Sequence, residues 1–362
     1  MTSEYTAFVD YRKIDPFKHA MELMGPQTFA FPNRRRVLVD RAGVYQYVGL
    51  RQPAWKMQPE GLGNKSGIAE IMSSLTGDPR HFAGVGIDTC MMAALDVARF
   101  GALPVICGDE VIAGRSEWFE REDVQRVIVS SFYEGCRQCG MALIGGESPV
   151  YRFLVNPAPP VPEASIFSVS AVGVIDPPER RIHHRVQSGA QILGVRSSGL
   201  HANGASLVIS EGAKLADGFL HVLPNGCTYG GEALIPTANY IPLIEALLAS
   251  WVDILAIVPV TGSGVAKLAN YQPPFTYRIN RWVEYPPLFR FLLSRGVSLQ
   301  GCLTTFNMGI GVYFLAREAF CDKLIGVGRQ AGYEVIHLGE VEDGERKVIF
   351  EPENGITLQP VS

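Results

Sequence analysis

The sequence predicts an α/β fold made of two domains of similar size. In both halves of the 362-residue chain, short apolar runs typical of strands alternate with longer segments whose apolar residues recur at helical spacing. A chain of this length is too long for one ordinary hydrophobic core, so two are expected. The segment I-D-P-P-E-R-R-I-H-H-R at 175–185 shifts abruptly to proline and charge, as a domain junction does. We therefore divide the chain into residues 1–175 and 176–362.

The first half is expected to hold five strands and three helices. The strands are apolar runs such as V-L-V-D, and we place them near 37–40, 83–87, 103–107, 141–146 and 164–174. The helices are expected near 68–75, 88–100 and 122–139. In the second of these helices, Met91, Leu95 and Ala98 fall on one face and Gly101 stands at the C′ position, which makes Asp88 the expected N-cap.

The second half repeats the alternation. We expect strands near 191–196, 254–260, 275–283, 308–315 and 334–342, and helices near 203–215, 239–250, 287–295 and 317–331. The polar turn S-S-G-L-H-A-N-G at 197–204 follows the first strand, and its Asn203 is able to cap the next helix. In T-F-N-M-G-I-G at 305–311, Gly309 and Gly311 permit positive φ or a close approach to a ligand. Taken alone, this segment fits a glycine-weakened strand equally well.

Composition excludes several classes of function. The formal net charge is −4 and no basic run exceeds R-R-R at 34–36, so we expect no nucleic-acid partner. No apolar segment approaches the length of a membrane span and the N-terminus does not resemble a secretion signal, which favours the cytoplasm and no membrane partner. Seven scattered cysteines suit a reducing compartment. Cys136 and Cys139 lie within a helical run, so we expect packing rather than a zinc or redox site.

A series of motifs in a fixed order identifies a family. From about Glu60 to the C-terminus the chain resembles the aminoimidazole ribonucleotide synthetase family, also called phosphoribosylformylglycinamidine cyclo-ligase. The matching segments are G-I-D at 86–88 with the later Asp96, G-A-L-P at 101–104 with Asp109, G-C-R-Q-C-G-M-A-L-I-G-G-E at 135–147, S-S-G-L-H-A-N-G at 197–204, L-I-P-T at 234–237, V-T-G-S-G at 260–264, Y-P-P-L-F-R at 285–290 and T-F-N-M-G-I-G at 305–311. The last two point to the cyclo-ligase branch of a superfamily that also contains selenophosphate synthetase, thiamine-phosphate kinase, hydrogenase-maturation and formylglycinamidine synthetase relatives.

The resemblance implies ATP-driven ring closure in de novo purine biosynthesis. ATP phosphorylates the formyl oxygen of formylglycinamidine ribonucleotide, the ribose-bearing nitrogen attacks the activated carbon, and phosphate leaves as aminoimidazole ribonucleotide forms. It implies ATP and Mg²⁺ as cofactors, a phosphorylated ribonucleotide substrate, and a homodimer with a mixed β-sheet core and flanking helices. Residues 1–175 become the ATP-binding, magnesium-binding and dimerisation domain, and 176–362 a second α/β domain. Strands apolar on both faces, such as F-S-V-S-A-V-G-V-I, need the cover that a second copy provides.

The family motifs also imply a set of site residues. E-G-L-G-N-K at 60–65 stands where the family has D-G-V-G-T-K, and the implied magnesium ligands are Glu60, Asp88 and Asp96. Because Asp88 and Asp96 are about 12 Å apart along a helix, we expect them to serve separate ions or phosphates. The implied catalytic residues are Lys65, Asp88, His201 and Asn203. The implied nucleotide-binding residues are Gly61, Gly63, Lys65, Asp88, Asp109, Gly145, Gly146, Glu147 and Asn307.

Each of the main polar residues also has a structural alternative. Asp88 fits a plain helix cap, Glu147 an exposed carboxylate at a strand end, and His201 a turn histidine bonded to backbone. Asn307 either binds the ligand or braces the glycine backbone. These alternatives stay open at the level of sequence.

The chain also departs from the family pattern. The usual glycine-rich loop is replaced by G-P-Q-T-F-A-F-P-N-R-R-R at 25–36, a second glutamate after G-G-E is absent, and Pro259 and Ser263 replace a histidine and a glycine. The three arginines 34–36 either grip phosphate in place of the loop or form a solvated basic turn. Three functions follow: the cyclo-ligase itself, a paralogue acting on a related ribonucleotide or amide, or a non-catalytic nucleotide-binding dimer.

Overall fold

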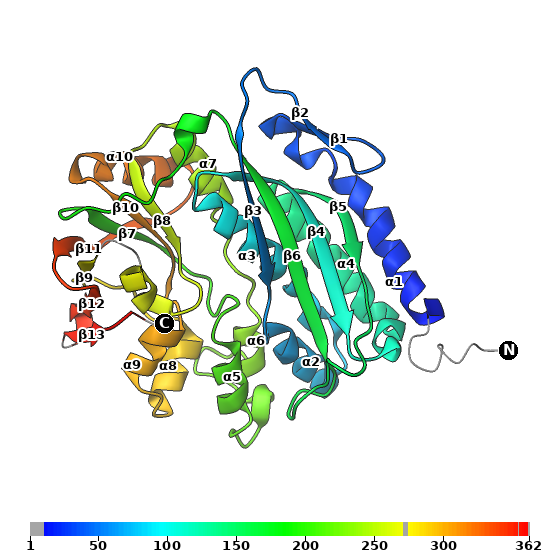
Figure 1. Cartoon of the computed structure of the whole chain (residues 1–362). Coiled ribbons are helices and arrows are strands. Elements are labelled where there is room, and N and C mark those ends of the chain that lie inside the picture. Colours follow the sequence, from blue (N-terminus) through cyan, green and yellow to red (C-terminus); the bar gives the residue numbers. More distant parts are fainter. Residues whose placement is uncertain (1–10, 271–273, 354, 361–362) are drawn as a thin grey trace.

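The first half of the chain forms a four-stranded mixed sheet covered on one face by helices (Figure 1). The computed structural model describes residues 11–270, 274–353 and 355–360. The sheet order is β3 (Ala54–Gly61), β6 (Ser165–Ile175), β4 (Leu103–Ala113) and β5 (Ala142–Glu147), and β4 and β5 are parallel while the other neighbours are antiparallel. The covering helices are α2 (Lys65–Thr76), α3 (Val85–Ala98) and α4 (Glu122–Cys139).

A small N-terminal unit packs on the edge of this sheet. It consists of α1 (Tyr11–Met24), which lies beside β5 and α4, and a hairpin of β1 (Val37–Val39) and β2 (Tyr45–Tyr47). The expected helices near 68–75 and 122–139 and the strands near 37–40, 103–107, 141–146 and 164–174 all appear. The strand β3 and the helix α1 were not predicted from the sequence.

The second half forms a seven-stranded sheet buried on both faces. Its order is β13 (Ile356–Leu358), β12 (Lys347–Phe350), β9 (Phe275–Ile279), β11 (Val335–Asp343), β7 (Gln191–Arg196), β10 (Ile310–Ala316) and β8 (Ile254–Pro259), antiparallel except for β12 with β9. Helices α7 (Ile241–Ala249) and α10 (Glu318–Gln330) pack on one face, and α5 (Ala205–Gly212), α6 (Tyr229–Ala233), α8 (Pro287–Ser294) and α9 (Leu299–Thr305) pack toward the other (Figure 1). The α/β class and the mixed sheets are confirmed.

One of the buried hydrophobic clusters contains residues of both halves. Met91 and Leu95 of α3 belong to the same buried cluster as Leu193 of β7 and Ile244 of α7. The two sheets are nonetheless built from separate parts of the sequence, because the last strand of the first sheet ends at Ile175 and the first strand of the second sheet begins at Gln191. In the ranges that the structure describes, no helix is long and apolar enough to span a membrane.

The strand expected at 83–87 is wrong, and so is the assignment of Asp88 as an N-cap. Residues 85–88 form the first turn of α3, and Gly84 precedes the helix. Gly86 lies so close to α4 that a Cβ atom there would be 2.4 Å from the Phe132 backbone nitrogen. Gly86 in the apolar run F-A-G-V-G-I therefore permits a close helix crossing, and Ser131 Oγ accepts from the Gly86 N–H.

One further local expectation is wrong, and another holds only in part. Asn203 does not cap α5, which begins at Ala205 after Gly204 with φ 91° and has no side-chain cap. Arg35 does not belong to a solvated turn, because it is buried and its Nη1 donates to the Cys139 carbonyl at 2.7 Å, whereas the side chains of Arg34 and Arg36 are more than half exposed, as in the basic-turn alternative. Arg34 and Arg35 both pair with Glu245 of α7, at 3.0 and 2.9 Å. They join the two halves instead of facing a ligand.

The cysteine prediction holds within the described residues. Cys136 and Cys139 lie in α4, fully buried and unpaired by disulfides. Cys136 Sγ lies 3.7 Å from Cys107 Sγ of β4, so the thiols pack between the helix and the sheet.

Candidate functional site

Two acidic residues, Glu60 and Asp109, lie in one row of side chains across the first sheet. Each belongs to a separate acidic group of the site. Glu60 of β3 pairs with Val169 of β6, Val169 pairs with Asp109 of β4, and Asp109 pairs with Gly146 of β5. Residues in one row point to the same face, and Val169 lies in the core beneath the helices. Glu60 and Asp109 therefore both face the helix layer, two strands and roughly 10 Å apart.

The first acidic group pairs Glu60 with Asp96 of α3. Burial and then the Asp96 carboxylate raise the pKa of Glu60, while Gln58 Nε2 donates to Glu60 Oε1 at 3.0 Å and opposes the rise. Asp96 Oδ1 is buried and accepts no hydrogen bond from the described residues. Two carboxylates held face to face repel each other unless a proton or a cation lies between them. The structure thus brings together two of the three residues expected to hold magnesium.

A lysine from the second half interacts electrostatically with this pair. Lys267 lies in the short 3-10 helix Gly264–Asn270, and its ammonium donates to Thr261 Oγ1. Burial lowers the pKa of Lys267 to about 8, and the negative charges of Asp96 and Glu60 oppose that shift. The charges of the carboxylate pair in the first half therefore act on a lysine of the second half. No motif pointed to Lys267, because a lone lysine after V-T-G-S-G carries no signal of its own.

The Glu60–Asp96 pair fits a magnesium ion in its chemistry. Both groups offer hard oxygen ligands, and one of the oxygens is buried without a partner. Within residues 11–270, 274–353 and 355–360, no group of three or more His, Cys, Asp or Glu side chains is arranged to hold a metal. That is compatible with magnesium, which commonly uses one or two carboxylates and takes its remaining ligands from water and phosphate.

The third expected ligand, Asp88, is engaged elsewhere. Its Oδ2 lies 2.8 Å from Lys65 Nζ, and both side chains are only 1% exposed. Its Oδ1 accepts from the Thr237 N–H at 2.6 Å, and Lys65 Nζ also donates to the Ile235 carbonyl at 2.8 Å. Both carboxylate oxygens of Asp88 are therefore bonded to protein groups, and the expected separation of Asp88 from Asp96 is confirmed. In this conformation neither Lys65 nor Asp88 is open to a ligand.

The turn at 197–204 packs next to that ion pair. His201 is buried with φ 56°, and its Nε2 accepts from the Ser198 N–H at 3.4 Å. Burial first, and then the Lys65 charge, lower the pKa of His201 to about 3, so its imidazole is neutral at pH 7. The structure thus shows the backbone-bonded turn histidine that sequence left as an alternative. Asn203 lies near Gly262 in the loop that leads to Lys267.

Asn307 braces this turn. Its Oδ1 accepts from Ser197 Oγ at 2.8 Å and from the Gly309 N–H at 2.9 Å, and its Nδ2 donates to the Gly199 carbonyl at 2.8 Å. Gly309 has φ 107°, and a Cβ atom at Gly311 would lie 2.7 Å from His201 Cε1. Gly311 therefore permits the close packing of this segment against His201, whereas a Cβ atom at Gly309 would lie 2.8 Å from Val283 Cγ2.

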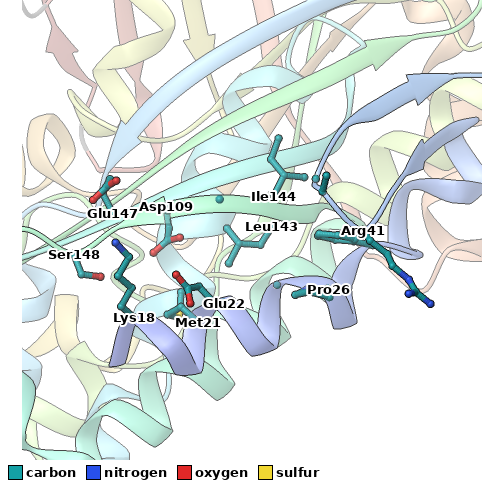
Figure 2. Close-up of a pocket in the computed structure, with 16 residues that line it drawn as sticks. Lys18, Met21, Glu22, Pro26, Arg41, Asp109, Leu143, Ile144, Glu147 and Ser148 are labelled. Carbon is teal, nitrogen blue, oxygen red and sulfur yellow. The ribbon is translucent and has the colours of Figure 1, made fainter. Parts of the chain in front are cut away.

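The second acidic group lines a pocket of about 200 Å³ between α1 and β5. Asp109, Gly145, Gly146 and Glu147 form one wall, and Figure 2 shows Lys18 of α1 pointing toward them. A Cβ atom at Gly146 would lie 2.0 Å from Asp109 Oδ1, so only glycine admits that carboxyl group. Burial, more than its charged neighbours, raises the pKa of Asp109 to about 8.

The expected residues thus fall into separate groups. Gly61 ends β3 beside Glu60, and Gly63 lines a different pocket together with residues of the loop at 154–165. Lys18 and Glu22, which line the Asp109 pocket, were not expected, because they precede the region of recognisable motifs. Glu147 is an exposed carboxylate at the end of β5, which matches the structural alternative given for it above. It also lines the Asp109 pocket.

Comparison with known proteins gives consistent results. The family model "AIR synthase related protein, N-terminal domain" matches residues 57–175. The phosphoribosylformylglycinamidine cyclo-ligase of Carboxydothermus hydrogenoformans is 30% identical over 83% of this chain and 84% of its own. The enzyme of the same name from Alkaliphilus oremlandii is 29% identical over 93% of this chain and 97% of its own.

Solved structures of other proteins share the fold. The thiamine-monophosphate kinase from Stenotrophomonas maltophilia K279a superposes with a TM-score of 0.61 over 98% of both chains at 17% identity. The hydrogenase maturation protein HypE in complex with ATP gives 0.57 over 88% of both chains, also at 17% identity. At this identity the likeness concerns the fold alone.

The buried ion pair leads to a prediction about stability. Asp88→Asn keeps the acceptor for the Thr237 N–H but leaves the buried Lys65 ammonium without a counter-charge, so unfolding should require about 3 kcal/mol less free energy. The double variant Lys65→Met with Asp88→Leu should recover much of that loss, because no charge stays buried. Urea unfolding measures both. Equal stability of Asp88→Asn and the parent would show that the pair is not a buried constraint.

The Asp109 pocket leads to a prediction about pH. A carboxyl group with a raised pKa in the folded state contributes stability below its unfolded pKa near 4, and that contribution is lost as pH rises toward about 8. Asparagine has no such titration. The unfolding free energy of the parent relative to Asp109→Asn should therefore fall steadily between pH 4 and pH 8. A difference that does not change over that range would contradict the burial of an ionisable group here.

Proposed function

Because the chain belongs to the phosphoribosylformylglycinamidine cyclo-ligase family, we propose that it is an ATP-dependent enzyme that closes formylglycinamidine ribonucleotide to aminoimidazole ribonucleotide, releasing ADP and phosphate. The family is one of ATP-dependent ligases, and the match extends over most of the chain. The observation that carries the proposal is the Glu60–Asp96 pair, with its buried unpartnered oxygen at the junction of the two halves. ATP as the cofactor is also supported by the ATP complex of the structural neighbour HypE.

In this proposal the paired carboxylates hold magnesium, and the Asp109 pocket receives part of the nucleotide. Magnesium supplies charge neutralisation for the phosphate groups when the terminal phosphoryl group moves to the formyl oxygen. Glu60 and Asp96 provide the carboxylate oxygens for it from β3 and α3. Because its pKa is raised, Asp109 carries a proton at neutral pH. It is therefore able to donate a hydrogen bond to the nucleotide, whereas an ionised carboxylate only accepts hydrogen bonds.

The polar residues of the second half position the substrate in this scheme. His201 is neutral, so we assign it no role as a phosphate-binding cation; it holds the turn that carries Asn203. In this proposal the Asn203 amide, which lies beside Gly262, binds the ribonucleotide. Lys65 and Asp88 fix the start of α2 and α3 against the second half, and act through this positioning.

The open face of the first sheet supports a homodimer. The helices cover only one face of the sheet, and side chains on the other include the exposed Trp55 and Met57 of β3 and Ile166 of β6. The β1–β2 hairpin covers one end of this face, where Tyr45 and Tyr47 contact the Trp55 ring, and the apolar side chains that stay exposed indicate a protein interface. We therefore propose that two copies pair through this face.

A paralogue with the same ATP chemistry on a related ribonucleotide or amide is the second candidate. It is supported by Pro259 at the end of β8 and Ser263 in the loop that follows, where the family has a histidine and a glycine. Lys267, which interacts electrostatically with Asp96 and Glu60, adds a positive charge to this part of the site. A change of this kind alters which substrate groups the site accepts.

A turnover assay tests the proposed reaction. The protein with formylglycinamidine ribonucleotide, ATP and Mg²⁺ should release phosphate and form an aminoimidazole that couples with a diazonium reagent. Glu60→Gln and Asp96→Asn each keep the side-chain shape but remove a charge from the metal site, and each should lower kcat/KM by about 100-fold or more. Asp217→Asn, on an exposed aspartate, is the matched control and should leave turnover unchanged. Phosphate release without the aminoimidazole product would favour the paralogue, and no ATP turnover with any substrate would favour a non-catalytic protein.

The dimer proposal has its own test. Sedimentation equilibrium at micromolar concentration should give twice the 39.5 kDa mass of one chain. Met57→Glu places a charge in the middle of the apolar face and should shift the protein toward the monomer, whereas Leu75→Glu, equally exposed on α2, should not. A monomeric parent would remove the proposal.

A further inference from the structure

Residues 156–162, in the proline-rich segment between β5 and β6, form a strap that is fixed at its two ends. At one end the Val155 N–H donates to the Tyr151 carbonyl at 2.8 Å, and at the other the Gly114 N–H donates to the Ala164 carbonyl at 3.1 Å. A Cβ atom at Gly114 would lie 2.4 Å from the Val155 carbonyl oxygen. Both ends of the strap therefore lie against the residue that follows β4, which makes that place a hinge.

Between its ends the strap is held weakly. The Val161 N–H donates to the Ala158 carbonyl at 2.9 Å, a bond within the strap, and among the described residues no hydrogen bond or ion pair joins 156–162 to another element. Val161 is half-buried, and the other six residues are exposed. A segment with so few hydrogen bonds and so much exposed surface opens at a low cost in free energy.

The side chain of Val161 packs in a notch between the two halves of the chain. Gly67, in the first turn of α2, lines the notch: a Cβ atom there would lie 3.2 Å from Val161 Cγ2 and 3.5 Å from Ile209 Cδ1 of α5. Val161 also packs against the buried cluster that contains Val208 of α5. A side chain of the first half thus reaches across α2 to α5, and the absence of a side chain at Gly67 leaves it room.

The strap forms one wall of a pocket of about 550 Å³ that both halves line, a volume typical of small-molecule sites. Asn64 and Ser206 are exposed at its mouth, where Asn64 Nδ2 donates to Ser206 Oγ at 2.8 Å. Ser66 also lines the pocket, but it is only 2% exposed. In sequence, Asn64 follows Glu60 by four residues and Ser206 follows Asn203 by three. The pocket therefore adjoins both segments to which the proposed reaction assigns ligands.

We propose that the strap is a gate to the inner part of this pocket, with Val161 as its latch, and that the ribonucleotide substrate enters when the strap swings away from Gly67. Asn64 and Ser206 then exchange their mutual hydrogen bond for bonds to the ligand, so both polar groups stay satisfied. Closure over the ligand keeps water away from the phosphorylated intermediate, as mobile lids do in other enzymes. The identity of the ligand rests on the proposed reaction, whereas the opening of the strap does not.

Thiol labelling measures the opening without any ligand. In a Cys227→Ser background, which removes the exposed native thiol, Ser66→Cys should react slowly with a maleimide because the closed strap covers it. Val161→Asp, which releases the latch, should raise that rate by about tenfold or more. Ala158→Asp is the matched control: it places the same charge on an exposed part of the same strap and should leave the rate unchanged. Equal rates for the two aspartate variants would show that Val161 is not a latch, and the inference would be wrong.

A reversible cross-link tests the gate during turnover. In the double variant Gly67→Cys with Val161→Cys, the two thiols lie close enough to form a disulfide with glutathione disulfide, which releases two molecules of glutathione. The cross-linked protein should form the aminoimidazole product about tenfold or more slowly than its reduced form, and dithiothreitol should restore the rate. The parent carried through the same oxidation and reduction is the control. Equal rates for the cross-linked and reduced forms would overturn the gate. If the parent forms no aminoimidazole at all, the proposed reaction is wrong, and the labelling rates alone decide whether the strap opens at Val161.

Discussion

The buried ion pair between Lys65 and Asp88 is the constraint on which the arrangement of the site depends. Removing two charges from water costs several kcal/mol for each ion unless they pair closely and their remaining hydrogen bonds are made. Here Lys65 and Asp88 are 2.8 Å apart, and the backbone of Ile235 and Thr237 satisfies both. The pair therefore holds the first turns of α2 and α3 against a segment of the second half. Glu60 precedes Lys65 by five residues and Asp96 follows Asp88 by two helical turns, so the same contact sets where both carboxylates stand relative to the second half.

The N-terminal region shows how a replaced loop acquires a structural role. Three arginines occupy the place of a glycine-rich loop, and a guanidinium fork is suited to phosphate. In the structure Arg35 instead lies buried between the Cys139 carbonyl and Glu245, and Arg34 shares that carboxylate. The helix α1 then lies along β5 and provides Lys18 as a wall of the Asp109 pocket. In this chain residues of a helix therefore line that side of the pocket.

Sequence was sufficient for the fold class, the family and most strands and helices, because each depends on periodic apolar patterns or on motifs in a fixed order. Prediction from sequence failed at residues whose type fits more than one structural role. Gly86 weakens a helix in isolation, yet it allows α3 to cross α4 closely. Asp88 looks like a cap or a ligand, and only the fold shows that Lys65 and Thr237 take its two oxygens. Lys18 and Lys267 carry no motif, since their importance comes from which strands and helices the topology places next to them.

The central claim is that metal and nucleotide meet at the Glu60–Asp96 pair. Anomalous scattering from crystals grown with Mn²⁺ and a non-hydrolysable ATP analogue would locate the ion directly. The account predicts a peak within about 2.2 Å of carboxylate oxygens of both Glu60 and Asp96. A bound nucleotide whose metal lies against Asp109 and Glu147, with none between Glu60 and Asp96, would contradict it.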